Sequence, residues 1–357
     1  MKGRQTDKQA LELWRRFHEG LAKDVLVDEG LSRYEIDRRR KELERDPVEW
    51  IRYFFPAYAK YDFAPFHIKA IRRIVANDEW YEVLSWSREL AKSTVVMFVL
   101  MYLTLTKRKR FVALAAATID AAERLLAPYK ANFEKNPRLI QFYGKQETIG
   151  AWTNTEFACA CGAKFIALGA GSAPRGMRNE AIRPDVLYFD DYDTDEDCRN
   201  PVTLDKKWQW AERALYPTRS ISEPTLVLWC GNIIAKDCCI TRAGALANSW
   251  DVVNIRDKHG RSTWPQKNTE DQIDRSLSKI SVRAQQGEAA AAAEHERLVD
   301  EYTRAVINPD KAVALGEIDA VIAPEDTRTV IVDSLAALRG KRDGRRTTPK
   351  KHDNGPL

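Results

Sequence analysis

The sequence predicts an α/β fold with a parallel sheet flanked by helices. Short apolar segments of strand length alternate with helical segments along the middle of the chain. Those helical segments are long enough to carry the chain back across a sheet between parallel strands. A content of 44% hydrophobic and 31% charged residues is typical of globular proteins, and 357 residues leave room for more than one domain.

The expected elements of the middle part follow one another in order. Strands are predicted at 81–87, 110–118, 184–191 and 223–232, with shorter strands between 151 and 170. Helices are predicted at 95–105, 119–137 and 205–217. The second of these helices ends at Asn136-Pro137, because a proline disfavours helical backbone in the residue before it.

The two ends of the chain have different patterns. Residues 7–55 are rich in charge and helix formers, which indicates two or three amphipathic helices. Near the other end we expect a helix (288–306), a short strand (320–323), a second helix (325–340) and a basic tail. The predicted domains are an N-terminal helical region (1–55), an α/β domain (56–281) and an α-rich C-terminal segment with a flexible basic tail (282–357).

Composition limits the class of protein. The longest apolar run, at 95–105, is shorter than the roughly 18 residues of a membrane span, so no membrane partner is expected. The first residues have no apolar signal-peptide core. A net charge of +5 permits a polyanionic partner without requiring one. Six cysteines suggest a reducing compartment, and CACG (159–162) with Cys238-Cys239 as zinc ligands is an alternative to buried thiols.

Residues 87–94, SRELAKST, have the placement of a phosphate-binding loop. They follow a predicted strand and open a predicted helix, so that free backbone N–H groups face phosphates. Lys92 is expected on the β- and γ-phosphates of a nucleotide, and Ser93 or Thr94 on Mg²⁺. The usual Walker A glycines are replaced by Trp86 and Ala91. A solvated lysine at an ordinary helix start is therefore an alternative.

The segment VLYFDD supplies the second part of such a site. An apolar strand ending in acids near the loop holds the magnesium shell in P-loop ATPases. Asp190 is expected to hold the water of the metal, and Asp191 to orient the attacking water. Glu196, a little further on, is a second candidate for the catalytic carboxylate. The alternative is a strand end followed by a solvated acidic loop.

With these motifs in this order, the chain resembles the ATPase domain of the large terminase subunit, the motor that packages DNA in tailed phages. The resemblance covers about residues 45–281 and implies a P-loop NTPase core of the RecA or ASCE type. Besides SRELAKST, the similar segments are FAPFHIKAIRRI (63–74), 115–144, 171–197, TLVLWCGNII (225–234) and WPQKNTEDQIDRSLSKIS (264–281).

The resemblance implies a Mg²⁺-dependent ATPase and a role for individual residues. The phosphate loop would bind ATP through Ser87, Arg88, Lys92, Ser93 and Thr94, with Ser93 and Asp190 as the metal-associated residues. Arg88 would act as an arginine finger in cis, a contribution of roughly 10³–10⁵ in rate. Asn232 would sense the γ-phosphate, and His67 would contact the adenine side.

The catalytic carboxylate stays open between two residues. Asp191 occupies a position where family members carry Glu, and it is one methylene shorter, so its reach to the water is in question. Glu196 therefore remains possible.

The resemblance also implies partners. The motor would translocate double-stranded DNA into a procapsid, with a small terminase subunit, a portal protein and further copies of itself in a ring, in the host cytoplasm. Packaging cannot depend on sequence, so DNA contacts should be to phosphates. The candidates are Lys107 to Arg110, Arg72 and Arg73. Arg175 and Arg178 are expected at a neighbouring subunit's nucleotide or at a DNA phosphate. For all of these, a solvated basic surface is the alternative.

The last part of the chain resembles a different family. INPDKAVALGEIDAVIAPEDTR (307–328) and KRDGRRTTPKKHDNGPL (341–357) are similar to the C-terminal end of the carboxyltransferase (β) subunit of acyl-CoA carboxylases. The glycine-rich parts that build the oxyanion holes of that enzyme are absent, so its chemistry is not expected. Too little chain follows residue 281 for the RNase H-like nuclease domain of terminases, so nuclease activity is not expected either. The alternative function is an inactive scaffold or carboxylase-related fragment fused to a degenerate P-loop domain.

Overall fold

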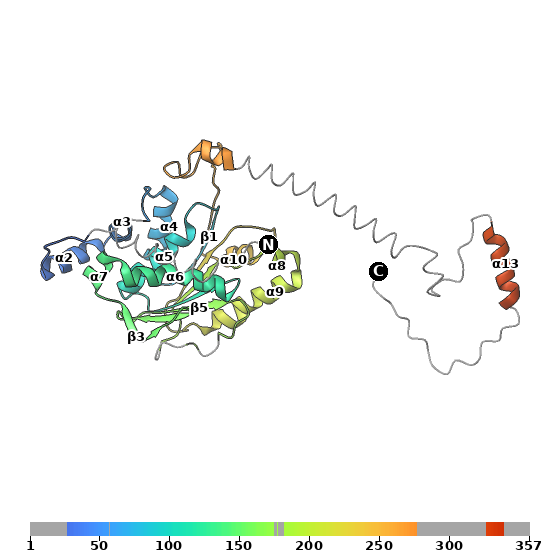
Figure 1. The fold of residues 1–357 in the computed structure, drawn as a ribbon, viewed down its shortest axis with the longest axis horizontal. Helices are drawn as coiled ribbons and strands as arrows, with labels where there is room; N and C mark the ends of the chain where they lie inside the picture. Colours follow the sequence, from blue (N-terminus) through green and yellow to red (C-terminus); the bar gives the residue numbers. More distant parts are fainter. Residues whose placement is uncertain (1–26, 57, 175–176, 178–181, 277–325, 339–357) are drawn as a thin grey trace, which may run out of the picture. The chain divides into compact units, whose positions relative to one another are not determined.

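A computed structural model describes residues 27–56, 58–174, 177, 182–276 and 326–338 (Figure 1). The chain divides into two units, Met1–Arg275 and Ser276–Leu357. The described part of the second unit is helix α13 (Thr327–Leu338), which confirms the helix expected at 325–340. The other elements expected beyond residue 281, and those before residue 27, lie outside the described residues. No described helix has the length and apolar character needed to cross a membrane.

The first unit is built on one eight-stranded, mainly parallel sheet, which confirms the predicted α/β class. The strand order is β3-β4-β5-β2-β6-β7-β1-β8. The β3–β4 and β4–β5 pairs are antiparallel, and every pair from β5 through β2, β6, β7 and β1 to β8 is parallel. The strands are β1 (Trp80–Trp86), β2 (Phe111–Ala116), β3 (Glu147–Trp152), β4 (Glu156–Cys159), β5 (Lys164–Gly169), β6 (Val186–Asp190), β7 (Leu226–Cys230) and β8 (Ser249–Val253).

Helices cover both faces of this sheet. They are α2 (Arg33–Leu43), α3 (Pro47–Phe54), α4 (Pro65–Ala76), α5 (Lys92–Leu105), α6 (Ile119–Lys135), α7 (Pro137–Tyr143), α8 (Asp195–Arg199), α9 (Pro201–Gln209) and α10 (Cys239–Leu246), with a π-helical turn η1 (Trp210–Leu215) and a 3₁₀ turn η2 (Tyr216–Thr218) after α9. The helix expected at 205–217 is thus α9, η1 and η2 in series. Strand β8 and helix α10 were not predicted.

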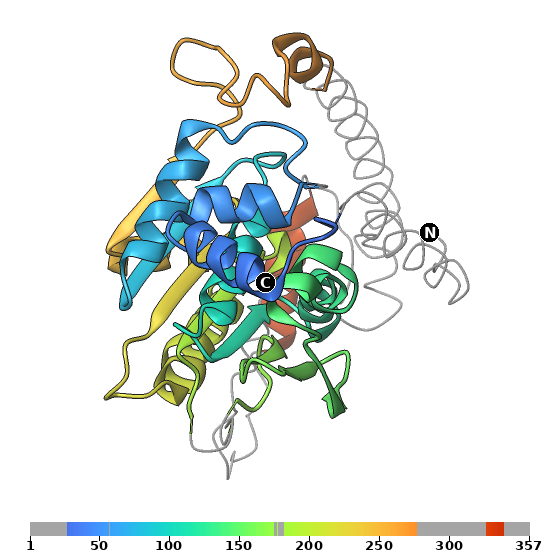
Figure 2. The same ribbon diagram turned by 90° about the vertical axis from the view of Figure 1, so that its left-hand side faces the viewer.

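Two apolar layers hold the helices on the sheet. Side chains from α3, α4, α5 and α6 form the larger layer with one face of the sheet, and α9, η1 and α10 form the smaller layer with the other. Helix α5 is apolar nearly all round and is buried, as such helices must be. The N-terminal helices join the larger layer, with α2 beside α3 and α7 (Figure 2). The Trp50 ring of α3 meets Tyr102 of α5 edge to face at 5.3 Å.

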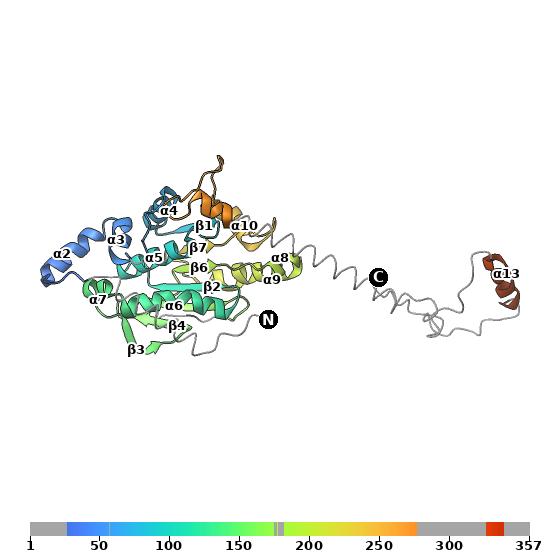
Figure 3. The same cartoon turned by 45° about the horizontal axis from the view of Figure 1, so that its top comes forward.

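The strand order decides which loops meet. Strand β7 lies between β1 and β6, as the sequence of labels in Figure 3 shows. Because carboxyl ends of parallel strands lie at the same edge of a sheet, ligands bind in the crevice outside that edge. The loop after β1, Asp190 and Asp191 at the end of β6, and the residues after Cys230 of β7 therefore face one another. The acidic strand is close to the phosphate loop as expected, but a third strand separates it from β1.

A buried ion pair fastens α4 to the sheet. Glu82 of β1 is fully buried and accepts hydrogen bonds from Arg73 Nε (2.9 Å) and Trp80 Nε1 (2.7 Å). Arg73 also reaches Asp251 of β8 at 3.4 Å. Burial raises the pKa of Glu82, and the Arg73 guanidinium opposes that shift. Arg73, expected to contact DNA, is thus engaged within the fold.

Replacing Arg73 by Met is expected to lower the free energy of unfolding by about 3–5 kcal/mol, because Glu82 is left buried without its cation. The double variant R73M/E82L should recover most of that loss, since both charges are gone. The matched control is R72M: the neighbouring Arg72 pairs with Asp46 at the surface, and its loss should cost less than about 1 kcal/mol. Urea denaturation measures all three. Equal losses for R73M and R72M would contradict this account.

Candidate active site

The loop after β1 turns through two left-handed residues although it contains no glycine. Glu89 (φ 70°) and Ala91 (φ 57°) both adopt left-handed backbone. Such a conformation costs a residue with a Cβ roughly 1–2 kcal/mol. Ala91 stands at the N-cap of α5 with no side-chain cap, so the first N–H groups of that helix have no partner from a capping side chain. The loop keeps the turn that glycine usually provides, at a cost in strain.

A buried histidine supports this loop from below. His67 Nε2 donates to the carbonyl of Leu90 at 2.9 Å, and Nδ1 accepts from the N–H of Ala64 at 3.0 Å. Burial lowers the pKa of His67 to about 4, so the ring is neutral at pH 7. In a trans peptide the C=O and N–H groups point in opposite directions. Holding the Leu90 carbonyl under the loop therefore turns the N–H of Ala91 to the other side, which is where an anion would bind.

Lys92 is the first residue of α5, and its ammonium group faces the ends of two other strands. Only 8% of the residue is exposed. Nζ lies 3.5 Å from Asn232 Oδ1, after β7, and 3.9 Å from Asp191 Oδ1, after β6. Both distances are long for direct contacts. The cation is thus enclosed but weakly held, which leaves it available for a stronger anionic partner.

Ser93 and Asp190 connect the loop to the end of β6. Ser93 Oγ donates to Asp190 Oδ1 at 3.0 Å. Burial, and next the negative charge of Asp191, raise the pKa of Asp190 to about 7, while Ser93 and Lys92 oppose the shift. Burial and the charge of Asp191 thus destabilise the ionised form of Asp190, and a nearby cation would stabilise that form.

These two oxygen ligands fit Mg²⁺. Carboxylate and hydroxyl oxygens suit that ion, which commonly keeps waters and substrate phosphates as its remaining ligands. Among the described residues, no group of three or more His, Cys, Asp or Glu side chains could hold a metal ion alone. The four cysteines considered as zinc ligands therefore do not form such a group, and all are free thiols: Cys159, Cys161, Cys238 and Cys239.

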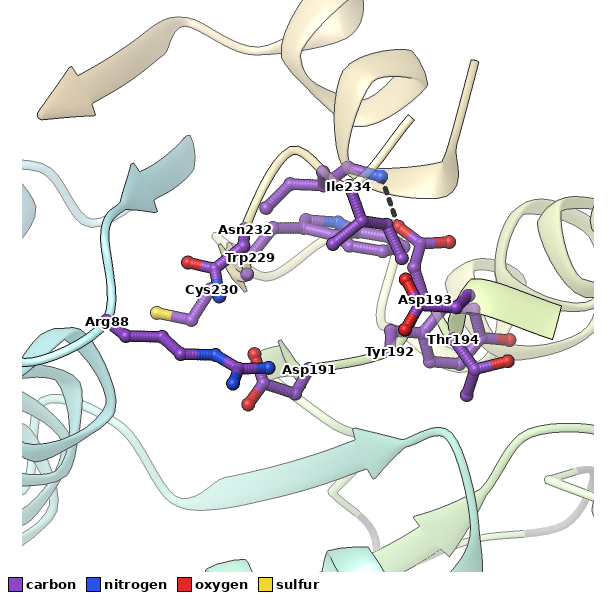
Figure 4. A pocket seen from close by; sticks show the side chains of 12 residues that line it. Arg88, Asp191, Tyr192, Asp193, Thr194, Trp229, Cys230, Asn232 and Ile234 are labelled. Carbon is purple, nitrogen blue, oxygen red and sulfur yellow. Dashed lines mark hydrogen bonds between the residues drawn. The ribbon is translucent and has the colours of Figure 1, made fainter. Parts of the chain in front are cut away.

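A cavity of about 220 Å³ opens beside these residues, and Arg88, Asp191 and Asn232 line it. Figure 4 shows the Arg88 side chain extending from the loop toward Asp191. Asp191 has left-handed backbone (φ 39°), and its side chain is 72% exposed. Its N–H donates to the carbonyl of Cys230 at 2.9 Å, which continues the β6–β7 ladder by one residue. The Asp191 carboxylate is thereby directed into the cavity.

Several predicted residues lie elsewhere. Glu196 is exposed on α8 and lines a separate cavity, bounded by Thr118, Lys206 and Trp210 among others, so the structure does not bring it to Arg88 and Asp191. His67 uses both ring nitrogens under the loop, and its adenine contact stays a prediction. Arg175 and Arg178 lie outside the described residues.

The remaining predicted loop residues flank the site. Ser87 connects the loop to β8, since its N–H donates to the Val253 carbonyl at 2.8 Å. Thr94 follows Ser93 in the first turn of α5 and is partly exposed. From the sequence, either Ser93 or Thr94 was expected on Mg²⁺. The hydrogen bond from Ser93 to Asp190 favours Ser93 over Thr94.

The structure separates the predicted DNA-contacting cations into two kinds. Lys109 is buried and donates to the carbonyls of Asp78 and Pro224, and Arg108 pairs with Asp78 at 2.5 Å. The prediction that Lys109 faces DNA is therefore wrong, because its ammonium group is used inside the fold. The side chains of Lys107 and Arg110 make no hydrogen bond or ion pair within the described part of the chain, and both are exposed.

Sequence reasoning missed residues that hold the site together. Asp193 accepts from the N–H groups of Cys239 (2.9 Å) and Ile240 (3.0 Å) and so caps α10. Lys267 contacts the loop at Glu89. Asp193 belongs to an acidic run in which no single residue stands out, and no local pattern links Lys267 to a loop nearly two hundred positions earlier.

Comparisons with known proteins found partial similarities, and no family model matches the chain. Segments of 56 and 66 residues are 43% and 42% identical to methylmalonyl-CoA decarboxylase subunit alpha of Veillonella parvula and of Propionigenium modestum. These segments are 16% and 18% of the chain, which spans about a tenth (11% and 12%) of those relatives.

Two solved structures are similar over a larger part. The HK97 bacteriophage large terminase has a TM-score of 0.43 and 14% identity, over 67% of this chain and 51% of that one. The Phi-28 gp11 DNA packaging motor has a TM-score of 0.31 and 12% identity, over 52% of this chain and 59% of that one. The chain thus spans between half and two thirds of each.

Proposed function

We propose that this chain is an ATP-hydrolysing motor domain that translocates double-stranded DNA, of the kind found in viral large terminase subunits. The observation that supports it is the meeting of Lys92, Ser93, Asp190, Asp191 and Asn232 from three strand ends at one edge of the sheet. A lysine, a hydroxyl, a buried acid, a second acid and an amide are the groups that phosphoryl transfer requires.

Phosphate binding would use the backbone and Lys92 together. The N–H groups from Ala91 to Thr94 are presented at the start of α5, where the helix dipole favours negative charge. Lys92 is loosely held by Asp191 and Asn232, so β- and γ-phosphates would replace these partners at small cost. Ser93 and Asp190 would hold Mg²⁺, which would supply positive charge against the charge that develops on the phosphates.

Hydrolysis would depend on the residues that line the cavity. When a phosphate pairs with Lys92, the Asp191 carboxylate would lose its contact with that lysine. It would then accept a hydrogen bond from the attacking water and orient it. Arg88 points into the same space and would stabilise charge on the transferring phosphoryl group. Asn232 Oδ1 lies 3.5 Å from Lys92 Nζ. Loss of the γ-phosphate from Lys92 would therefore change the contact between these two side chains.

DNA binding would use the opposite edge of the sheet. A cavity of about 680 Å³ is lined there by Lys107, Arg110 and Arg183, whose side chains form no hydrogen bond or ion pair with described residues. The acids Asp78 and Glu223 also line it, and Arg108 neutralises Asp78. Free cations at one surface suit contacts to backbone phosphates. A small terminase subunit, a portal protein and a homo-oligomeric ring are the partners this function would require, in the host cytoplasm.

Mg-ATP hydrolysis, measured with and without linear duplex DNA, tests the proposal. Lys92→Ala and Asp190→Ala should each lower kcat/KM at least about 100-fold, because the first removes a cation from the phosphates and the second a carboxylate that would hold the metal. Lys135→Ala, at the exposed end of α6, is the matched lysine control and should behave like the parent. A parent chain that neither binds nor hydrolyses ATP, even concentrated and with DNA, would refute the proposal in favour of an inactive scaffold.

The catalytic carboxylate is tested by comparing Asp191→Asn with Glu196→Gln. Asp191→Asn should lower kcat by about 10²–10⁴, the usual contribution of a positioned base, and leave nucleotide affinity nearly unchanged. Glu196→Gln should retain parental kcat, because Glu196 lines a different cavity. Loss of kcat in Glu196→Gln with normal activity in Asp191→Asn would reverse the assignment.

The basic surface is tested through the salt dependence of DNA binding. In Lys107→Ala/Arg110→Ala, the slope of log K against log salt concentration should fall by about 1 per lost phosphate contact. The control is Arg33→Ala/Lys41→Ala, which removes the same charge from the exposed side of α2. An equal change of slope in both variants would mean that only net charge matters and that this surface is not the DNA contact.

A further inference from the structure

The chain that follows β8 returns to the outside of the phosphate loop. Residues 264–268 lie against Glu89, the loop residue with φ 70°. Lys267 Nζ donates to the Glu89 carbonyl at 2.8 Å and contacts the Glu89 carboxylate at 3.0 Å. Asn268 Nδ2 lies 3.5 Å from the same carbonyl. We call residues 264–268 the strap.

The ammonium group of Lys267 is held in place by a tryptophan. Nζ lies over the Trp264 ring, 5.2 Å from its centroid. Trp264 is 5% exposed, its Nε1 donates to the Asp62 carbonyl at 2.8 Å, and its ring packs edge to face on His67 at 4.5 Å. The cation is therefore anchored on a fixed platform, and its own side chain is 26% exposed.

The strap and His67 hold two consecutive peptide groups of the loop. Lys267 binds the carbonyl of Glu89 from outside, and His67 binds the carbonyl of Leu90 from beneath. These two peptide groups lie between the two left-handed residues, Glu89 and Ala91. A loop with glycine would adopt this conformation without support. In this loop the same conformation has to be stabilised by contacts.

We propose that Lys267 is a positioning residue that holds Glu89 in its left-handed conformation and so organises the anion site in a loop without glycine. The Lys267–Glu89 ion pair itself contributes little, because the carboxylate is 72% exposed. The hydrogen bond from Lys267 to the Glu89 carbonyl stabilises the left-handed conformation, because it fixes the plane of the peptide after Glu89. This inference rests on the proposed function only in naming ATP as the anion.

The test is a rescue experiment on the full chain, with Mg-ATPγS as the probe. Lys267→Met should weaken its binding about tenfold, because the strained loop loses its support. Adding Glu89→Gly should restore affinity to within about threefold of the parent, since glycine adopts φ 70° freely. Lys267→Arg should retain most of the affinity. Lys258→Met, an exposed lysine in the preceding turn, should change nothing.

A remote glycine controls for general relief of strain. Lys107 also has left-handed backbone (φ 60°), but it lies at the opposite edge of the sheet. Lys107→Gly should therefore not rescue Lys267→Met. Rescue by Lys107→Gly, no rescue by Glu89→Gly, or parental affinity in Lys267→Met would each overturn the proposal.

The same variants separate this inference from the proposed function. Without nucleotide, Lys267→Met and Glu89→Gly should be non-additive in the unfolding equilibrium constant by about tenfold, as expected for residues in contact. If the parent binds no Mg-ATPγS, the proposed function fails, and this double-mutant cycle alone decides the role of Lys267. Additive effects would overturn that role.

Discussion

The hydrogen bond between Ser93 and Asp190 joins the loop after β1 to the end of β6, and the rest of the site depends on the strand order that permits it. Strand β7 lies between these two strands and delivers Asn232 to the space they enclose. Parallel pairing places all three ends at one edge. Burial of that edge then leaves Asp190 with a raised pKa and Lys92 with only long contacts. Asp190 and Lys92 are thus buried charged groups at this edge.

The missing glycines have a structural answer. Ala91, at one of the two positions where glycine is expected, has left-handed backbone, and so does Glu89, two residues earlier. Strain of this kind persists only where surrounding structure over-determines it. Here the surroundings are His67 below the loop and Lys267 outside it, both packed on Trp264. Elements before and after the sheet thus meet at the loop, so its conformation depends on residues that lie far apart in the chain.

The sequence was sufficient to predict the α/β class. It also predicted the loop between β1 and the helix that begins at Lys92, and the strand that ends at Asp190. Apolar strands followed by polar or acidic residues are local patterns, which is why these features could be predicted. It did not predict β8, a strand with no buried residue, or α10, whose cap comes from Asp193 far along the chain. Whether a basic residue lies at the surface was harder to predict. Arg73 and Lys109 look like surface cations in sequence, but burial and backbone carbonyls that only folding assembles give them internal partners. The sequence placed Asp191 at the expected position and kept Glu196 as a second candidate, and the two residues line different cavities.

A structure of the chain with Mg²⁺ and a non-hydrolysable ATP analogue tests the central claim most directly. The account predicts β- and γ-phosphates on the N–H groups of Ala91 to Thr94 and on Lys92, with the metal between Ser93 and Asp190. It also predicts that Lys92 leaves Asp191 and that Glu89 keeps its left-handed backbone. A nucleotide bound elsewhere, or phosphates seated on the loop without Lys92 and Asp190, would contradict it.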